Sequence, residues 1–277
     1  MKKRLLRGGT VARLGLFAVV STVLVSGSIK AKAQQPGATP APALTPQEIT
    51  ALQHYKEQTE VMLKDWPNLK RYHEQDATLP APGSGERRVV FMGDSITEGW
   101  MNHGAGASEA NPGFFPGKPY IDRGISGQTT PQMLLRFRQD VIDLKPSVVV
   151  IFAGINDVAG NTGDMTPQQT EENLTSMAEL AKAHDIRVVM CSILPAFDFP
   201  WKPGREPAPK IVEINRWIKT YAESNGHVYV DFYSAMVDAR GGLPANLSHD
   251  GVHPKPAGYA IMNPLVEAGI AQALGRK

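Results

Sequence analysis

Hydrophobic and polar positions along this chain form two repeating kinds of segment from residue 86 onward. The first kind is a short, nearly continuous apolar run rich in valine, isoleucine and phenylalanine, which is typical of a strand buried on both faces. Such runs occupy residues 88–92, 147–153, 186–194 and 228–232, and a weaker run occupies 118–122. The pattern therefore predicts about five strands.

The second kind of segment has the spacing of an amphipathic helix. Apolar residues three and four positions apart form two stripes, one at Leu134, Phe137, Val141 and Leu144 and the other at Ile211, Ile214, Ile218 and Tyr221. The pairs Thr130-Pro131 and Thr166-Pro167 indicate two helix starts, because threonine caps a helix and proline fits its first turn. A last helix should begin near Pro256 and should kink or break at Pro264.

Strict alternation of strands and helices predicts an α/β fold, in which a parallel sheet of about five strands carries helices on both faces. Folds of this class bind their ligands beyond the carboxyl ends of the strands. Candidate functional residues are therefore expected in the loops that follow the predicted strands.

The first 33 residues differ in composition from the rest of the chain. Five of the first 13 residues are basic, residues 14–25 form an apolar run, and Ala31-Lys32-Ala33 offers a small-x-small cleavage pattern. This combination predicts an export signal that is cleaved after Ala33, leaving a secreted or periplasmic protein without a stable membrane anchor. The alternative is an uncleaved anchor, but the run is shorter than the roughly 20 residues that span a bilayer.

Three further regions follow the predicted signal. Residues 34–44 are rich in proline and alanine and read as a flexible linker. Residues 45–85 form an N-terminal helical extension, whose first helix starts at Thr45 with a capping box closed by Glu48. Residues 86–277 then form the main α/β domain.

Charge and cysteine content limit the possible functions. The whole chain has a formal net charge of +2, and removing the seven Lys and Arg of residues 1–33, which contain no Asp or Glu, takes it to −5. A mildly acidic mature protein does not have the basic surface that nucleic-acid binding requires. The chain has one cysteine, Cys191, so no intramolecular disulfide can form, and its apolar surroundings favour an inert buried thiol over a nucleophile.

The loops after the predicted strands carry the groups that a serine hydrolase needs. Ser95 follows the first strand in Gly-Asp-Ser, Asn156 follows the third, and Asp250 stands three residues before His253 near the end of the chain. Serine chemistry requires a base, a carboxylate that orients the base, and donors for an oxyanion. The alternative for Ser95 is an ordinary helix-capping serine.

These blocks resemble the SGNH (GDSL-type) hydrolase superfamily. Gly-Asp-Ser, a glycine loop, Gly-x-Asn-Asp and Asp-x-x-His occur in that order between residues 93 and 253. The stretches "GISGQTTPQMLLRF" and "KPSVVVIFAGIND" look especially like the branch that contains the platelet-activating-factor acetylhydrolase catalytic subunits. The resemblance implies a flavodoxin-like three-layer fold, with residues 86–277 as the catalytic domain.

The resemblance also implies roles for individual residues. Ser95 would be the nucleophile, His253 the base and Asp250 its orienting carboxylate. The oxyanion hole would consist of the backbone N–H groups of Ser95 and Gly127 and the side-chain amide of Asn156. One departure is Asp122, where the family usually has asparagine, and this puts the local hydrogen bonding in question.

Several neighbouring residues have simpler interpretations. Ser126 lacks the last glycine of the Gly-x-Ser-x-Gly elbow, so it is not expected to be a nucleophile. Asp94 and Asp157 are interpreted as loop organisers, and Gly127 could also be an ordinary turn glycine. His249 is four residues from His253, a metal-ligand spacing, but the glycine and proline nearby disfavour the helix that such a site needs. No metal or other cofactor is expected.

The resulting expectation is an exported serine esterase that cleaves short acyl esters, above all acetyl esters, of a small molecule or a carbohydrate. The alternatives are a lipid-directed acylhydrolase or thioesterase and a non-catalytic carbohydrate-binding module on the same fold. The long loop 102–119 should border the site. Its Phe114 and Phe115 could either line an apolar patch or anchor the loop to the core. The sequence does not indicate an oligomeric state.

Overall fold

The computed structural model describes residues 44–102 and 114–275. The chain divides into two compact units, residues 1–48 and 49–277, and the second contains all the strands found among the described residues. The predicted export signal and nearly all of the predicted linker lie outside the described residues. So does most of the loop expected to border the site.

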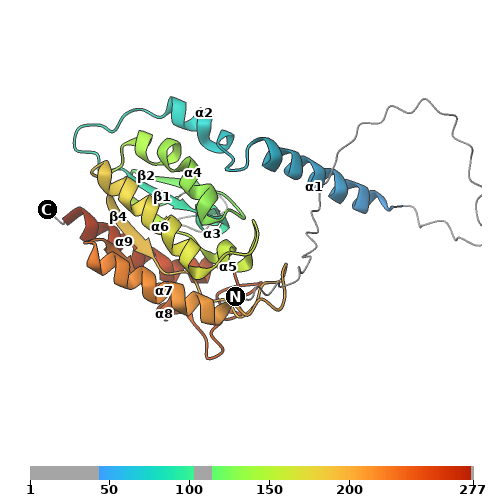
Figure 1. Ribbon diagram of the computed structural model, residues 1–277. Coiled ribbons are helices and arrows are strands. Elements are labelled where there is room, and N and C mark those ends of the chain that lie inside the picture. The colour runs from blue at the N-terminus through green and yellow to red at the C-terminus, as the bar shows by residue number, and fades with distance from the viewer. Residues whose placement is uncertain (1–43, 103–113, 276–277) are drawn as a thin grey trace, which may run out of the picture. The chain divides into compact units, whose positions relative to one another are not determined.

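One sheet forms the centre of the second unit (Figure 1). Its five parallel strands lie in the order β2-β1-β3-β4-β5. Their bounds are β1 Val89–Gly93, β2 Tyr120–Gly124, β3 Val148–Phe152, β4 Arg187–Cys191 and β5 Val228–Val230. Every residue of β1 and β3 is buried, which explains why these strands read as continuous apolar runs. The predicted parallel sheet is confirmed.

Helices cover both faces of the sheet. The described α-helices are α1 Pro46–Lys64, α2 Lys70–Thr78, α3 Ser95–Gly99, α4 Thr130–Asp140, α5 Ile155–Ala159, α6 Pro167–Ala183, α7 Pro207–Ser224, α8 Tyr233–Met236 and α9 Pro256–Gly275. Two short 3-10 turns lie at Trp100–Asn102 and Ile142–Leu144. Figure 1 shows α4, α6 and α7 side by side in front of the sheet and α9 behind it. These layers form the predicted three-layer α/β fold.

Helix starts follow local capping chemistry. Thr45 and Glu48 form the predicted capping box of α1, and Thr166 and Gln169 form one at α6. The predicted cap of α4 is wrong by one residue, because Thr129 is the N-cap and Thr130 already lies in the helix. The hydroxyl of Thr130 bonds to the carboxylate of Asp157 and so takes no part in capping the helix.

The expected break at Pro264 does not occur, because α9 runs on to Gly275. Proline removes one helical N–H and leaves the carbonyl four residues earlier, at Ala260, without its partner. Both residues are exposed, so water can reach that carbonyl. The buried side chains of Val266 and Ile270, beyond the proline, hold the rest of the helix against the sheet.

Phe114 and Phe115, in the described end of loop 102–119, pack on the core. The ring of Phe115 is 1% exposed and stacks on Phe91 of β1 at 5.5 Å, and the ring of Phe114 meets Phe91 edge-on at 4.8 Å. Of the two alternatives for this pair, the anchor is therefore the one observed.

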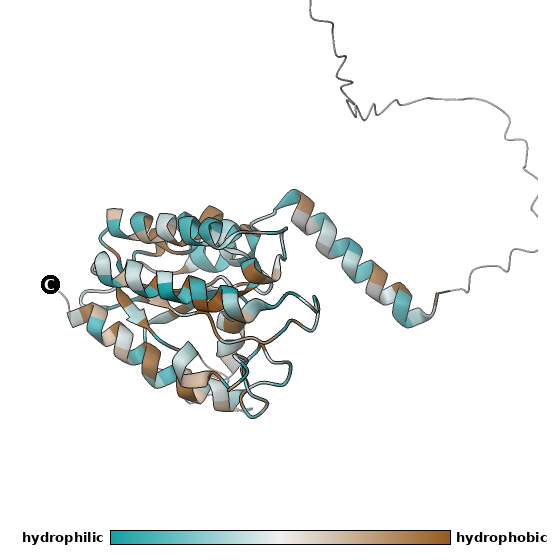
Figure 2. Cartoon of the chain, turned by 60° about the horizontal axis from the view of Figure 1, so that its bottom comes forward, coloured by the Kyte–Doolittle hydropathy of each residue, from teal (hydrophilic) through white to brown (hydrophobic). Residues whose placement is uncertain are grey.

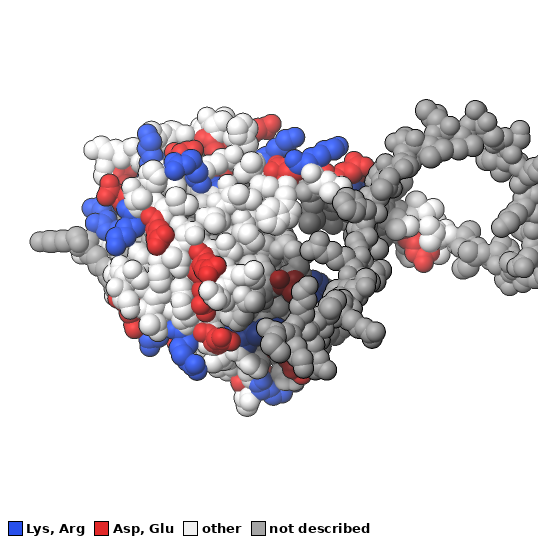
Figure 3. All heavy atoms as spheres, in the orientation of Figure 1, with Lys and Arg blue, Asp and Glu red and all other residues white. Residues whose placement is uncertain are grey.

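The surface of the described part is mixed in polarity and charge. Figure 2 shows apolar and polar positions alternating along the outer helices. Figure 3 shows acidic and basic side chains interspersed on the face that carries α4, α6 and α7. None of the helices in the described part is long and apolar enough to cross a membrane.

Candidate active site

Ser95 is presented where β1 ends. The strand stops at Gly93, and the Asp94 carboxylate accepts a hydrogen bond from the backbone N–H of Ile96 at 3.0 Å, which caps the short helix α3. Asp94 is the loop organiser expected from the sequence, and its burial raises the pKa of the carboxyl to about 7. Ser95 is the first residue of α3 and remains partly exposed.

Two glycines allow α3 to approach the sheet closely. A Cβ on Gly93 would lie 2.0 Å from Thr97 Oγ1, and a Cβ on Gly124 would lie 2.2 Å from the backbone nitrogen of Glu98. Real Cβ atoms are not found so close to other heavy atoms. Glycine at the ends of β1 and β2 is therefore what lets the helix carrying Ser95 sit against both strands.

Three polar side chains form a continuous chain of hydrogen bonds. Ser95 Oγ lies 3.0 Å from His253 Nε2, and His253 Nδ1 lies 2.6 Å from Asp250 Oδ2. Partial burial of the Asp250 carboxyl would raise its pKa. The side-chain hydrogen bond from His253 and the backbone N–H groups of His253 and Val252 outweigh burial and lower the pKa to about 2. Asp250 is therefore ionised at neutral pH.

The loop that carries His253 and Asp250 is closed by its own hydrogen bonds. Asp250 Oδ1 accepts the backbone N–H groups of Val252 at 2.9 Å and His253 at 2.8 Å. Ser248 Oγ donates to the carbonyl of His253 at 2.7 Å. His249 is exposed and takes no part in these bonds.

The residues expected to stabilise an oxyanion lie in two neighbouring loops. Gly127 is exposed, and its φ of +78° is in the left-handed region that favours glycine. Asn156 is 3% exposed at the start of α5. Its Nδ2 donates to the carbonyl of Gln128 at 3.0 Å, and its Oδ1 accepts from Asn161 Nδ2 at 2.8 Å. These contacts fix the orientation of the amide and leave one Nδ2 hydrogen for another acceptor.

A buried arginine connects the serine turn with the glycine loop. Arg136 of α4 donates to the Gly93 carbonyl at 3.0 Å and to Gln128 Oε1 at 2.6 Å. Asp140 pairs with the same guanidinium at 2.9 Å, so the buried charge is compensated. The glycine loop also bonds directly to the serine turn, because the N–H of Ile125 donates to the Gly93 carbonyl at 3.1 Å.

Comparison with known proteins agrees with this arrangement. A model of the GDSL-like lipase/acylhydrolase family matches residues 91–261, which is more than half of the chain and includes every residue of the site described above. The chain belongs to this family. The family is one of lipases and acylhydrolases, and the resemblance seen in the sequence motifs is confirmed.

Individual relatives differ in how much of each chain they cover. The crystal structure of a GDSL-like lipase from Bacteroides thetaiotaomicron VPI-5482 has a TM-score of 0.71 at 46% identity, covering 76% of this chain and 100% of that one. An acetylxylan esterase from Geobacillus stearothermophilus is 28% identical over 205 residues, which are 65% of this chain and 91% of that enzyme. The lipoprotein YqeF of Bacillus subtilis (strain 168) is 31% identical over 137 residues, 44% of this chain, and this chain spans about half of it (54%).

Like Asp94, the aspartate of the Gly-x-Asn-Asp block lies outside the hydrogen-bond chain and has a structural contact. Asp157 is buried and accepts hydrogen bonds from the backbone N–H of Thr130 at 3.0 Å and from the Thr130 hydroxyl. Burial raises the pKa of Asp157 despite these bonds. The carboxylate thereby ties α5 to the start of α4, which agrees with its interpretation as an organiser.

Asp122, the departure from the family pattern, lies beneath the glycine loop. Its Oδ1 accepts the N–H of Gly124 at 2.6 Å, and its Oδ2 is buried with no hydrogen-bond partner. Burial raises the pKa of the Asp122 carboxyl to about 7, although the N–H of Gly124 opposes that shift. The fold therefore holds this carboxyl in a position that favours its neutral form.

The segment before and within α2 supports the glycine loop. Tyr72 donates from its hydroxyl to the carbonyl of Gly124, and Gln128 Nε2 donates to the carbonyl of Pro67 at 2.8 Å. Glu98 of α3 accepts both the N–H and the hydroxyl of Ser126 and pairs with Arg71 at 2.9 Å. Ser126 is thus occupied by a structural contact, as its missing elbow glycine suggested.

A cavity of about 440 Å³ opens beside the glycine loop. Its walls come from the segment before α2, the glycine loop and the turn after α5, and include Trp66, Ile125, Gly127, Gln128 and Asn161. Gly127 and Asn161 belong to both this cavity and the oxyanion loops. The cavity therefore borders the candidate active site.

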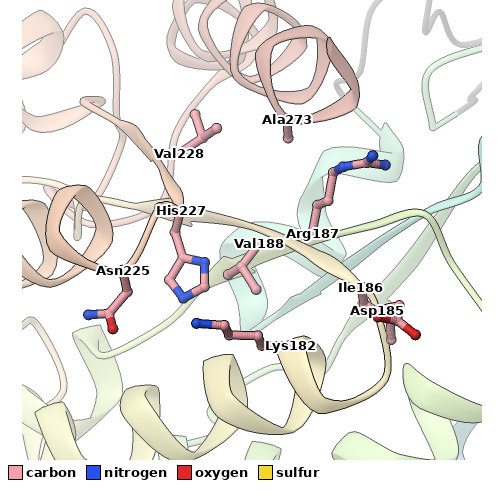
Figure 4. A pocket seen from close by; sticks show the side chains of 10 residues that line it. Lys182, Asp185, Ile186, Arg187, Val188, Asn225, His227, Val228 and Ala273 are labelled. Carbon is pink, nitrogen blue, oxygen red and sulfur yellow. The ribbon is translucent and has the colours of Figure 1, made fainter. Parts of the chain in front are cut away.

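Another cavity, of about 390 Å³, lies at the opposite edge of the sheet (Figure 4). Lys182, Arg187 and His227 are among the residues that line it, near the amino ends of β4 and β5. Helices α6 and α7 both end there, and helix C-termini carry partial negative charge. Because parallel α/β sheets bind ligands at the other edge, we assign this cavity no catalytic role.

The structure gives no support to a cysteine nucleophile or to a metal site among the described residues. Cys191 is buried in β4, and burial raises the pKa of its thiol, so the thiol stays protonated. Within residues 44–102 and 114–275, no three His, Cys, Asp or Glu side chains gather into a possible metal-binding group.

Sequence reasoning missed Asn161, Arg136 and Trp201. Asn161 contacts both Gly127 and Asn156, and Trp201 lies beside His253. The contacts of Asn161 with Gly127 and of Trp201 with His253 join residues of different loops, and no motif spacing in the sequence predicts such contacts. Only Arg136 had a signal in the sequence: a charged residue between the apolar positions Leu134 and Phe137 of a predicted helix indicates a buried charge that needs partners.

Proposed function

We propose that the chain is an exported serine esterase that hydrolyses short acyl esters through an acyl-enzyme. The observation that carries this proposal is the continuous hydrogen-bond chain from Ser95 through His253 to Asp250. Nucleophile, base and orienting carboxylate are within hydrogen-bonding distance in the order that acyl transfer requires.

The reaction begins when His253 Nε2 accepts the proton of Ser95 Oγ while that oxygen attacks the ester carbonyl carbon. Negative charge then develops on the carbonyl oxygen, which accepts hydrogen bonds from the N–H groups of Ser95 and Gly127 and from the remaining Nδ2 hydrogen of Asn156. Asp250 stabilises the imidazolium that forms. His253 next protonates the leaving alcohol oxygen, and water attacks the acyl-enzyme by the same route.

We further propose that the substrate is an acetyl ester, with an acetylated carbohydrate as the best candidate. The similarity to an acetylxylan esterase, of which the match covers 91%, supports this choice. Export is supported by the composition of residues 1–33 and by the similarity to a protein named as a lipoprotein. A lipid-directed acylhydrolase or thioesterase is the alternative within the same chemistry.

Two measurements test the proposal. A fluorophosphonate probe should label the wild-type protein at Ser95 and should not label Ser95→Ala, whereas a non-catalytic carbohydrate-binding module would remain unlabelled. Hydrolysis of nitrophenyl esters from acetate to palmitate, alongside acetylated xylan, then ranks the acyl groups. Highest activity on acetate supports the proposal, and highest activity on palmitate supports the lipid-directed alternative.

A further inference from the structure

Trp201 is an exposed aromatic ring next to the proposed catalytic base. It lies in the loop between β4 and α7 and is 41% exposed. Its ring centroid is 6.0 Å from that of the His253 imidazole, with 41° between the ring planes. Nothing in the proposed hydrolytic steps uses this side chain.

The loop holds the indole in a defined position. Phe199 is fully buried beneath it, with the two ring centroids 5.2 Å apart. The Asp198 carboxylate closes the loop by accepting the N–H groups of Phe199 at 2.8 Å and Gly204 at 3.0 Å. The indole N–H donates to Asn161 Oδ1 at 3.2 Å. The exposed ring is therefore preorganised, which lowers the entropy cost of binding a ligand on it.

Its position specifies the part of the substrate that it would meet. His253 Nε2 delivers the proton to the leaving oxygen, so the alcohol part of the ester must leave on the His253 side of the serine. Trp201 lies on that side. The acyl part, by contrast, stays on Ser95 when the alcohol departs.

The surroundings of the ring fit a sugar better than an alkyl chain. The face of an indole is electronegative and apolar, so it attracts the weakly positive C–H groups on one side of a pyranose ring. Polar groups border the same place: the Asn161 amide, and Lys202, whose Nζ donates to the carbonyl of Gly160. One apolar face among hydrogen-bonding groups matches the mixed surface of a carbohydrate.

We propose that Trp201 determines specificity for the alcohol part of the substrate, because the sugar ring of the leaving alcohol stacks on its indole. Asn161 fixes the orientation of the indole. This inference rests on the proposed esterase function and adds to it the binding subsite for the alcohol. It predicts that removing the ring impairs acetylated sugars and leaves small aliphatic acetates nearly unaffected.

The test compares two acetyl esters that differ only in the alcohol. For Trp201→Ala, kcat/KM on acetylated xylooligosaccharides should fall about tenfold, mainly through KM, whereas kcat/KM on ethyl acetate should change less than about twofold. Trp201→Tyr keeps an aromatic face and should retain most of the activity on the sugar ester. Ethyl acetate also serves as the control for folding of both variants.

Phe197→Ala is the matched control in the same loop. Phe197 is 56% exposed, but the guanidinium of Arg240 lies 5.4 Å above its ring and already covers that face. This variant should lose little activity on either ester. An equal loss on both esters in Trp201→Ala, no loss on the sugar ester, or the same sugar-specific loss in Phe197→Ala would overturn the inference.

The experiment also separates this inference from the proposed function. If the wild-type protein hydrolyses ethyl acetate, and Trp201→Ala does not selectively reduce kcat/KM on the sugar ester, the protein is still an esterase. That result refutes only the role of Trp201 in binding the sugar. Wild-type protein that hydrolyses neither ester and is not labelled at Ser95 by a fluorophosphonate refutes both.

Discussion

At the scale of single residues, Asn156 has a hydrogen-bonding pattern suited to a developing negative charge. One Nδ2 hydrogen and the Oδ1 atom are already engaged, so the amide cannot flip without losing both contacts. We predict that Asn156→Ala lowers kcat by about 10²–10³, roughly 3–4 kcal/mol, and changes KM only a few-fold, because the lost contact strengthens in the transition state.

Steady-state kinetics of folded Asn156→Ala on nitrophenyl acetate measure this effect. Asn156→Asp should be at least as impaired, because a carboxylate repels the oxyanion, whereas Asp157→Ala should mainly lower stability. A near-normal kcat in folded Asn156→Ala would return Asn156 to the role of a turn residue.

The two histidines of the last loop provide a second test at this scale. His253→Ala should lower kcat by about 10⁴ or more, because His253 is the proposed base and its Nε2 lies 3.0 Å from Ser95 Oγ. His249→Ala should have little effect, because His249 is exposed and outside the hydrogen-bond chain. Asp250→Asn should be severe, since an amide does not hold the imidazole in the required tautomer. The opposite ranking of the two histidines would contradict the assignment.

Asp122 should make stability depend on pH. Its pKa in the folded protein is raised to about 7 from an ordinary value of 3.8. The folded state therefore binds the proton more tightly, so this contribution to stability is complete below about pH 4 and is lost as pH rises to about 7. Asp122→Asn cannot ionise and should reduce the loss of stability between pH 4.5 and 8 by a few kcal/mol.

Chemical denaturation of wild type and Asp122→Asn at the two pH values measures this difference. An identical pH dependence in wild type and Asp122→Asn would show that Asp122 ionises in the folded state as it does in the unfolded state.

Motif residues were accessible from sequence, and their supporting residues were not. Ser95, Asp250 and His253 stand in short patterns whose chemistry is readable, and the structure brings their side chains together. Asn161 and Trp201 meet across 40 residues of chain. Such contacts depend on how two loops pack against each other, and the order of apolar and polar residues within either loop does not predict that packing.

At the scale of elements, apolar density predicted four of the strands well, including the edge strand β5, and the other edge strand, β2, poorly. Strand β2 contains Asp122 and Arg123, which are buried but polar, so its run of apolar residues is short. Arg123 is compensated by Asp76 of α2. That partner comes from a separate segment, and a single run of residues cannot reveal it.

Close packing of α9 on the sheet gives a prediction for one glycine. A Cβ on Gly269 would lie 2.4 Å from Val230 Cγ2 and 3.5 Å from Val189 Cγ1. Gly269→Ala should therefore destabilise the protein by about 1–3 kcal/mol, although alanine is the better helix former. Gly275→Ala, with no atom within 4 Å of the added Cβ, should be neutral or slightly stabilising. Thermal or chemical denaturation compares the two, and equal stabilities would contradict the close contact.

At the scale of the whole molecule, strand order was not determined by sequence, but the edge that carries the site was. Parallel strands bring all their carboxyl ends to one edge, so loops from β1, β2 and β3 had to meet there. The support that the segment before α2 gives to the glycine loop and to α4 was not predicted, because it rests on side-chain amides of Gln128 and Gln132 bonding to carbonyls of an irregular segment.

Export gives the prediction at this scale. If residues 1–33 are a cleaved signal, N-terminal sequencing of the exported protein should begin at Gln34, and the mature chain should migrate as an acidic protein. Replacing apolar residues of the 14–25 run by charged ones should retain the protein in the cell. Recovery of exported protein that begins at Met1 would favour the uncleaved anchor.

The closed loop at residues 248–254 has a consequence for how the enzyme could be altered. Because the proposed base, His253, and the proposed orienting carboxylate, Asp250, are positioned by hydrogen bonds within a few residues, the loop itself fixes the geometry between them. The sheet and its helices then have to maintain the distance from Ser95 to His253 and the positions of Gly127 and Asn156 relative to Ser95. The proposed acid–base pair itself depends on only the first of these long-range distances. Insertions in the other loops at this end of the sheet can therefore reshape the pocket without changing the geometry between His253 and Asp250. The loop can be exchanged between related proteins as one unit.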